Sequence, residues 1–174
     1  MSLRDVRIGQ AAPEIVNAVI EIPRGDHNKY EYDEEMDVIK LDRVQYTAMA
    51  CPQNYVFIPD THCDDGDHLD GFLFSSFDLT QACVVEARVI GVIYMDDGGE
   101  QDDKVLLVPV EDMRFDQVND VSDLSPHLIE EIIHYLKHYK DIKKAPGVVE
   151  ITGHKGREEG VKVVVEAINA YDQL

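Results

Sequence analysis

Alternation of apolar and polar side chains dominates the first two thirds of the chain and predicts β-strands there. Residues 29–33 (KYEYD) alternate strictly, and residues 37–44 (DVIKLDRV) follow after a tight acidic turn. Period-2 runs on either side of a short turn are typical of a β-hairpin. The short apolar runs at 17–22 and 55–58 each stop at a proline, and we expect both to be strands.

A longer apolar run, ACVVEARVIGVIYM at 82–95, is too rich in β-branched residues for an exposed helix. We expect one long strand that bends at Gly91, because an isolated glycine within a strand pattern marks a bulge or a close backbone approach. The polar segment 96–103 then predicts a turn, and 104–110 (KVLLVPV) predicts a returning strand.

The apolar period changes to that of helices in the last third. Ser125-Pro126 is a typical helix start, and the apolar positions from 128 to 136 follow at helical spacing. We expect one more strand at 147–152 and a final helix at 157–171, although Gly160 gives that helix a low propensity. Short strands followed by helices predict an α+β fold around a small antiparallel barrel, with the whole chain, 1–174, as one domain.

Charge narrows the possible partners. The formal net charge is −19, with 35 acidic residues against 16 basic ones. Such a chain lacks the basic surface that binds nucleic acid or an anionic membrane. The first 25 residues hold no apolar core of a signal peptide, no apolar run is long enough for a membrane span, and the three cysteines have no paired spacing. We therefore expect a cytoplasmic protein with free thiols.

Two acidic turns carry the candidate chemistry. The first is CDDGDHLDG at 63–71, and the second contains Asp96, Asp97, Glu100, Asp102 and Asp103. Two like charges about 4 Å apart repel by about 4 kcal/mol at an effective dielectric near 20, so clustered carboxylates favour a compensating cation. Oxygen ligands of this kind suit Mg²⁺ or Ca²⁺. One such turn alone is more typical of a solvated surface, but two turns that flank one long strand weaken that interpretation.

Besides the two acidic turns, the sequence has candidate phosphate-binding residues next to strand or helix ends. These basic residues are Lys29, Arg43, Lys104 and Lys140. Each alone is more typical of a surface salt bridge, whereas lysine and arginine together are common phosphate ligands. Carboxylates that bind metal beside bases that bind phosphate are the two requirements of metal-assisted phosphoryl transfer.

The ordered set of motifs resembles the family I soluble inorganic pyrophosphatases. The segments that carry the resemblance are EIPRGDHNKYEYD, LDRVQYTAMACPQNYVFIPDT, DDGDHLD, GGEQDDK and HYKD, and they extend from about residue 16 to 141. The resemblance implies a five-stranded OB-like barrel with additional strands and two flanking helices. It also implies Mg²⁺-dependent hydrolysis of pyrophosphate to two phosphates.

The same resemblance implies a role for each matched acid. Asp65, Asp70 and Asp102 resemble the direct ligands of two activating metals, with Asp70 bridging both. Asp97, together with Asp102, resembles a ligand of metal that arrives with the substrate. Asp67 resembles the general base for the attacking water.

Other matched residues are implied to surround the substrate and the metals. The phosphate contacts are Lys29, Arg43, Tyr55, Tyr139 and Lys140. Lys104 is implied to support the acid cluster, and Glu21 and Glu31 to hold metal-bound water. From the residues alone, packing would be the favoured role of both tyrosines.

The chain also departs from the family pattern. His68 stands where the acidic motif usually has proline, and we expect a tolerated, exposed side chain in a looser turn. Cys51 replaces a common tyrosine, and Gly98 replaces a frequent acid. Catalytically impaired members that only bind metal or phosphate are the alternative, and a nucleic-acid-binding barrel is a third that the charge disfavours. The resemblance further implies a homo-oligomer, in the form of a hexamer, with His134 and His138 at a subunit interface.

Overall fold

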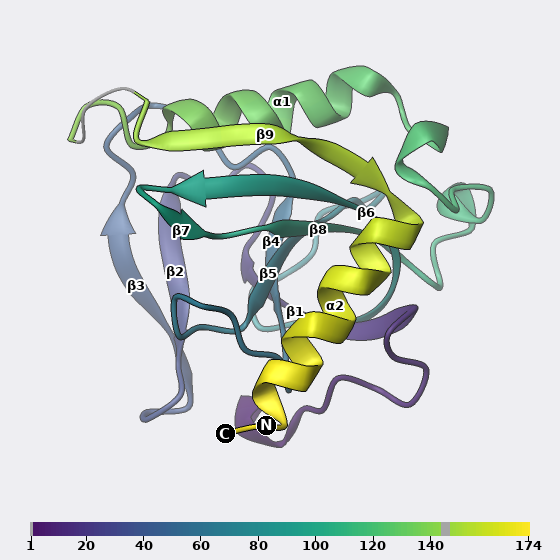
Figure 1. The fold of residues 1–174 in the computed structure, drawn as a ribbon. Helices are drawn as coiled ribbons and strands as arrows, with labels where there is room; N and C mark the ends of the chain where they lie inside the picture. Colours follow the sequence, from purple (N-terminus) through teal and green to yellow (C-terminus); the bar gives the residue numbers. More distant parts are fainter. Residues whose placement is uncertain (1, 144–146) are drawn as a thin grey trace.

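The computed structural model describes residues 2–143 and 147–174 (Figure 1). Its strands, in chain order, are β1 (Ile15–Ile22), β2 (Asn28–Asp33), β3 (Val38–Val44), β4 (Asn54–Ile58), β5 (Leu69–Leu73), β6 (Val84–Asp97), β7 (Glu100–Gln101), β8 (Lys104–Pro109) and β9 (Val149–Gly156). The α-helices are α1 (Pro126–His138), which precedes β9, and α2 (Arg157–Tyr171), which follows it. Short 3-10 helices cover Leu3–Asp5, Met113–Phe115 and Val121–Asp123.

Five strands close into a barrel. They pair in the order β1-β4-β5-β8-β6, and β6 returns to pair with β1. The first half of the long β6 pairs with β1, while its second half pairs with β9. The predicted five-stranded barrel with extra strands and two helices is confirmed. Its sheet is mixed, however, because β5 and β8 run parallel, whereas the prediction was an antiparallel barrel.

Strand β5 is an element that the hydrophobic pattern did not predict. Asp70 and Gly71 interrupt its apolar run, which removes the usual signal. Gly71 is needed because a Cβ there would lie 2.6 Å from the carbonyl oxygen of Val105 on β8. The missing side chain lets the parallel pair form and places Asp70 beside the start of β8.

Gly91 of β6 and Gly160 of α2 lie in close contact where the helix packs on the strand. The register of β6 against β8 shifts between Val89 and Gly91, which confirms the predicted irregularity of the long strand. A Cβ on Gly160 would lie 2.5 Å from the Gly91 carbonyl oxygen, so α2 can approach β6 only with glycine there. Packing of Val164 and Ala167 compensates for the low helix propensity of α2.

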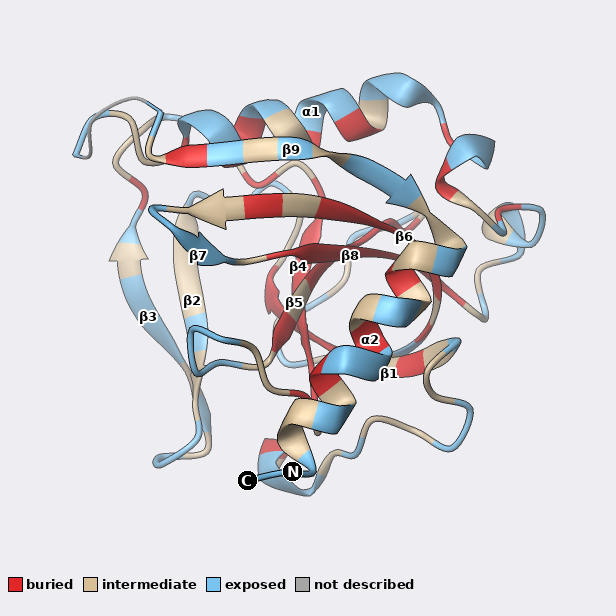
Figure 2. Cartoon of the chain, viewed as in Figure 1, coloured by how far each residue is buried: buried red, intermediate tan, exposed pale blue. Residues whose placement is uncertain are grey.

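The barrel strands are buried on both faces (Figure 2). Phe72 and Leu106 belong to the apolar cluster under α1, while the next residues, Leu73 and Leu107, belong to the cluster under α2. Successive side chains of a strand point to opposite faces, so each strand contributes to both clusters. This double burial is why β4 and β8 read as continuous apolar runs.

The hairpin of β2 and β3 forms a separate two-stranded sheet beside the barrel (Figure 1). Both predicted strands of the hairpin are confirmed, as are the two helices and the strand in the last third. Among the described residues, no helix is long and apolar enough to cross a membrane.

Candidate active site

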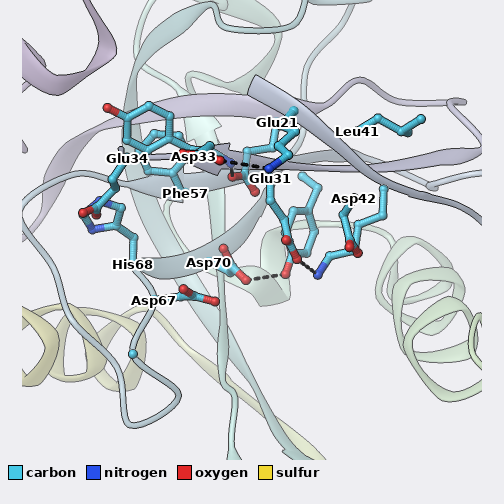
Figure 3. A pocket seen from close by; sticks show the side chains of 15 residues that line it. Glu21, Glu31, Asp33, Glu34, Leu41, Asp42, Phe57, Asp67, His68 and Asp70 are labelled. Atoms are coloured by element: carbon cyan, nitrogen blue, oxygen red, sulfur yellow. Dashed lines mark hydrogen bonds and ion pairs between the residues drawn. The ribbon is translucent and has the colours of Figure 1, made fainter. Parts of the chain in front are cut away.

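An open cavity of about 550 Å³ lies between the hairpin and the barrel (Figure 3). Its walls come from β1, β2, β3, β4, β5 and the loop between β4 and β5, residues 59–68, which we call the acidic loop. The lining is mostly charged. Six residues of the predicted site are part of it: Glu21, Lys29, Glu31, Tyr55, Asp67 and Asp70.

The acidic loop folds back on itself before β5. Gly66 has φ +94°, a left-handed conformation that favours glycine. The Cys63 N–H donates to the Asp67 carbonyl oxygen (2.9 Å), and the Asp67 N–H donates to Asp65 Oδ1 (3.1 Å). The loop thereby places Asp65 and Asp67 next to Asp70. Burial, together with the charges of Asp65 and Asp70, raises the pKa of the Asp67 carboxyl.

A buried lysine connects the two acidic turns. Lys104 is only 2% exposed, and its Nζ donates to Asp70 Oδ2 (3.0 Å) and to Asp102 Oδ1. Burial alone would lower the pKa of Lys104, but Asp70 and Asp102 outweigh it and raise that pKa. Burial raises the pKa of Asp102. The parallel β5–β8 pair creates this arrangement because it sets Asp70 beside Lys104.

Tyr55 completes this group from β4. Its hydroxyl donates to Asp70 Oδ2, and the Lys104 ammonium lies 5.7 Å from the centre of its ring. Burial, then the negative charges of Asp70 and Asp102, raise the pKa of the Tyr55 phenol well above its usual value. The phenol therefore stays a neutral hydrogen-bond donor at physiological pH.

The remaining predicted cations gather around Tyr139, directly after α1. Lys29 and Arg43 are opposite each other across the hairpin. The Arg43 guanidinium lies 6.0 Å from the centre of the Tyr139 ring and the Lys140 ammonium lies 5.2 Å from it. Lys140 pairs with Asp97, and Lys29 pairs with Glu31. Burial raises the pKa of Tyr139 to about 12, so this phenol is also a neutral donor.

Glu21 is a buried carboxyl at the end of β1. It accepts a hydrogen bond from the Tyr32 N–H (2.7 Å), which ties the barrel to the hairpin. Burial and the neighbouring Asp70 raise the pKa of Glu21 to about 8. Figure 3 shows Glu21 and Glu31 on one side of the cavity, facing Asp67 and Asp70.

The predicted ligands Asp65, Asp70, Asp97 and Asp102 do not form a compact coordination shell. Within residues 2–143 and 147–174, no three His, Cys, Asp or Glu side chains converge as a group that could hold a metal ion. Lys104 lies between two of these acids, and Lys140 pairs with a third.

The chemistry of the donors nevertheless fits a hard divalent cation. All four are carboxylates, which Mg²⁺ prefers over nitrogen and sulfur ligands. Asp97 Oδ1 is buried and has no hydrogen-bond partner in the described part of the chain. An unpaired buried oxygen of this kind costs free energy, and a cation would remove that cost.

Some lining residues were not predicted from the sequence. Asp33 and Lys40, which pair at 3.1 Å, line the cavity together with Glu34 and Asp42. Asp33 follows Lys29 and Glu31 at period 2 on β2, and this alternation could have revealed it. Conversely, the acidic Asp103 is buried and accepts a hydrogen bond from the Met95 N–H (3.0 Å), so it holds the turn.

The departures from the family pattern have structural explanations. Gly98 has φ +70°, which favours glycine, and Cys51 is buried with its thiol donating to the Gln53 carbonyl oxygen (3.1 Å). The prediction of an exposed His68 is wrong. Its side chain is 17% exposed, because the ring stacks on Phe57 with centroids 5.3 Å apart.

The fold and cavity define a small β-barrel protein whose cleft is lined by carboxylates, lysines and tyrosines, and Arg43 pairs with Asp42, one of the lining residues. The inorganic pyrophosphatase family model matches residues 18–172. The chain is 41% identical to an inorganic pyrophosphatase of Thermus thermophilus over 98% of both chains, and 43% identical to one of Saccharolobus solfataricus over 95% of this chain and 96% of that one.

Solved structures agree with this similarity. The crystal structure of inorganic pyrophosphatase from Thermus thermophilus superposes with a TM-score of 0.93 at 40% identity, covering 99% of each chain. That of an inorganic pyrophosphatase from Neisseria gonorrhoeae has a TM-score of 0.91 at 38% identity and covers 97% of each. The chain belongs to the inorganic pyrophosphatase family.

Proposed function

We propose that this chain hydrolyses inorganic pyrophosphate to two phosphates in the acidic cleft, with Mg²⁺ as the cation held by its carboxylates. Family membership supports the reaction. The observation that carries the site is the buried Lys104 between Asp70 and Asp102, beside the raised-pKa carboxyl of Asp67. Buried carboxylates and perturbed pKa values in a cleft are typical of active sites.

The metal ligands in this proposal are Asp65, Asp70, Asp97 and Asp102. Glu21 and Glu31 lie further out and would accept hydrogen bonds from water around the ions. Mg²⁺ bound there supplies Lewis acidity, which lowers the pKa of the attacking water and neutralises phosphate charge. The carboxylates orient this chemistry because they come from two turns fixed by the parallel β5–β8 pair.

Asp67 is proposed as the general base. A raised pKa makes the Asp67 carboxylate a stronger base, which favours proton transfer from water. Its carboxylate points into the cavity beside Asp70 (Figure 3). No side-chain hydrogen bond to this carboxylate is found in the described part of the chain, which leaves its oxygens available to water.

The substrate phosphates are proposed to contact the cations and phenols around Tyr139: Lys29, Arg43, Tyr55, Tyr139 and Lys140. The lysines and the arginine offset charge on the leaving phosphate. The two phenols donate hydrogen bonds without adding charge, because their raised pKa values keep them protonated. Lys104 lies behind the acids and keeps Asp70 and Asp102 in place.

A phosphate-release assay tests the proposal. The purified chain with millimolar Mg²⁺ is expected to release phosphate from pyrophosphate, and EDTA is expected to abolish the release. Calorimetric binding of Mg²⁺ and pyrophosphate without turnover would identify a binding module and contradict the proposed hydrolysis.

We further propose a homohexamer. The exposed face of α1 carries His134 and His138, whose ring centroids are 4.6 Å apart, and His138 Nδ1 lies 2.7 Å from Asp141 Oδ2. A surface cluster of this kind can pair with a second copy of itself across a twofold axis. The cytoplasmic location stays a prediction.

A further inference from the structure

His68 is held in the acidic loop by contacts on three sides of its ring. Its ring stacks on Phe57 (centroids 5.3 Å apart, planes at 14°), and Phe57 stacks in turn on Tyr32 (5.1 Å, 5°). His68 Nδ1 donates to the Thr61 carbonyl oxygen (2.8 Å), and Nε2 lies 2.9 Å from Glu34 Oε1. Figure 3 shows His68 next to Glu34 at one end of the cavity.

The ring also lines two cavities. One is the cleft, and the other is a second cavity of about 190 Å³ whose lining includes the N-terminal residues Leu3, Val6 and Arg7. The surroundings of the ring are therefore partly open. Its contacts to Phe57, Thr61 and Glu34 add to the backbone hydrogen bonds that hold this part of the loop in place.

Those contacts connect the hairpin to both ends of the loop. Thr61, near the loop's start, accepts the His68 Nδ1–H at its carbonyl and the Leu69 N–H at its hydroxyl (2.8 Å). Glu34 lies in the turn of the hairpin. Since no side-chain partner restrains the Asp67 carboxylate within the described residues, the backbone at Asp67 decides where it points.

We propose that His68 is a positioning residue. Its ring stacks on Phe57, contacts Thr61 and Glu34, and thereby fixes the backbone that directs the Asp67 carboxylate into the cleft. This inference rests on the proposed role of Asp67 in pyrophosphate hydrolysis. A misplacement of about 1 Å in a reacting group can lower a rate by about 100-fold, so a lost ring should affect turnover more than binding.

The first test compares His68→Ala with the unchanged chain. We expect kcat to fall about 10- to 30-fold while KM stays within about twofold, because the substrate contacts are elsewhere. His68→Asn keeps an N–H near the position of Nδ1 and is expected to recover most of kcat. An unchanged kcat in His68→Ala overturns the proposal, and so does a change confined to KM.

The second test asks whether His68 acts through Asp67. In the Asp67→Asn background, His68→Ala is expected to lower kcat by no more than about twofold, since the group it positions is already lost. A full additional loss in that background overturns the proposal. If the unchanged chain fails to hydrolyse pyrophosphate at all, the proposed function itself is wrong, which is a different result.

A third measurement does not depend on activity. Amide hydrogen exchange of Cys63, Asp67 and Leu69 in the metal-free protein is expected to be at least about tenfold faster in His68→Ala, because the loop opens more often. His62→Ala, at the start of the same loop, is the matched control and should leave kcat and exchange unchanged. Should His68→Ala unfold, His68→Gln, whose amide lies too far along the side chain to replace Nδ1, provides the same comparison, and unchanged exchange in it overturns the proposal.

Discussion

Individual buried residues determine how the negative charge of the acids in this cleft is compensated. Lys104 neutralises Asp70 and Asp102 inside the barrel, where an unpaired carboxylate would be costly. Glu21 reaches the same balance differently, because its raised pKa of about 8 lets it hold a proton in place of a cationic partner. Substitutions of Lys104 and Glu21 are therefore expected to have distinct effects on stability, and substitution of Asp67 is expected to affect catalysis.

Replacing Lys104 with methionine should strongly destabilise the metal-free protein. The substitution leaves the partly buried Asp70 and Asp102 without their buried cation, and a broken pair of this kind costs up to about 3–5 kcal/mol in free energy of unfolding. Urea denaturation with EDTA measures this. Lys162→Met is the control, because Lys162 pairs with Glu158 and Glu159 at the exposed surface and should cost less than about 1 kcal/mol. Equal effects of both substitutions would contradict this interpretation.

Replacing Asp67 with asparagine should abolish most activity without loss of stability. If Asp67 is the general base proposed above, its removal lowers kcat by about 100-fold or more. The raised pKa of Asp67 shows that its neighbours disfavour the charge, so a neutral amide should leave the melting temperature unchanged or higher. Phosphate release and thermal unfolding are the two measurements. Asp64→Asn, on an exposed loop residue, is the control, and a comparable loss of kcat there would remove the special role of Asp67.

Glu21 predicts a specific pH dependence for the metal-free protein. Between pH about 4.5 and about 8 the folded chain holds a proton on Glu21 that the unfolded chain has released, so its contribution to stability falls as the pH rises. Glu21→Gln should remove this slope and raise the free energy of unfolding at pH 8.5 by roughly 1–3 kcal/mol. The two proteins should converge near pH 4.5.

Denaturation at several pH values in EDTA measures the Glu21 effect. Glu14→Gln, at an exposed position before β1, serves as its control and should keep the slope of the unchanged chain. A Glu21→Gln variant that is less stable than the unchanged chain at pH 8.5 would contradict the raised pKa.

At the scale of elements, close backbone contacts decide how helices and strands meet the cleft. The glycine pair at 91 and 160 lets α2 rest on β6, and Gly71 lets β5 pair with β8. Neither contact is visible as a hydrophobic pattern. Each depends on the absence of a side chain, so its effect appears only when one is added.

Adding a methyl group at Gly160 should destabilise the protein. Alanine is favoured over glycine in a helix by about 1 kcal/mol, but its Cβ would lie 2.5 Å from the Gly91 carbonyl oxygen. Overpacking of this kind costs about 1–3 kcal/mol, so Gly160→Ala should lower the melting temperature despite its helix propensity. Glu166→Ala, on the exposed side of α2, should change it little. A more stable Gly160→Ala variant would show that α2 can shift away from β6.

The sequence predicted most elements because their patterns are local. Alternation predicted the hairpin, and the change of period predicted α1. β5 was not predicted because Asp70 and Gly71, the residues that serve the site and the parallel pairing, interrupt its pattern. In the same way, His68 was predicted as an exposed departure from a motif, since its stacking on Phe57 is a contact between a loop and a strand that sequence spacing does not reveal.

The candidate site also has a part that the sequence could predict and a part that it could not. The acids and bases were predicted because a family resemblance carries them by position, and six residues of the predicted site line the cavity. How they are paired could not be predicted. The insertion of Lys104 between Asp70 and Asp102 depends on the parallel register of two strands that are more than 30 residues apart in the chain.

For the whole molecule, the net charge of −19 sets the conditions for assembly. Like-charged chains repel one another, and salt screens that repulsion within about 10 Å at 0.1 M and about 3 Å at 1 M. The proposed hexamer must bring six such chains together. Its interfaces should therefore be more stable at higher ionic strength.

The mass in solution tests the hexamer. Six chains of 19.7 kDa give 6 × 19.7, or about 118 kDa, and light scattering should find this mass at 0.5 M NaCl. Substituting His138 with glutamate adds like charge to the exposed face of α1 and should yield smaller species. Lys137→Gln, the neighbouring exposed position, should retain the hexamer. A mass near 20 kDa at every salt concentration would contradict the proposal.

The parallel pairing of β5 with β8 also sets the order in which the protein can mature during synthesis. Residues 74–103 must leave the ribosome and return to the start of β5 before Lys104 can reach Asp70. Tyr139 is synthesised later still. Long-range closures of this kind are slow to form. A nascent chain that stops before β8 therefore carries the acidic loop without its buried counter-charge.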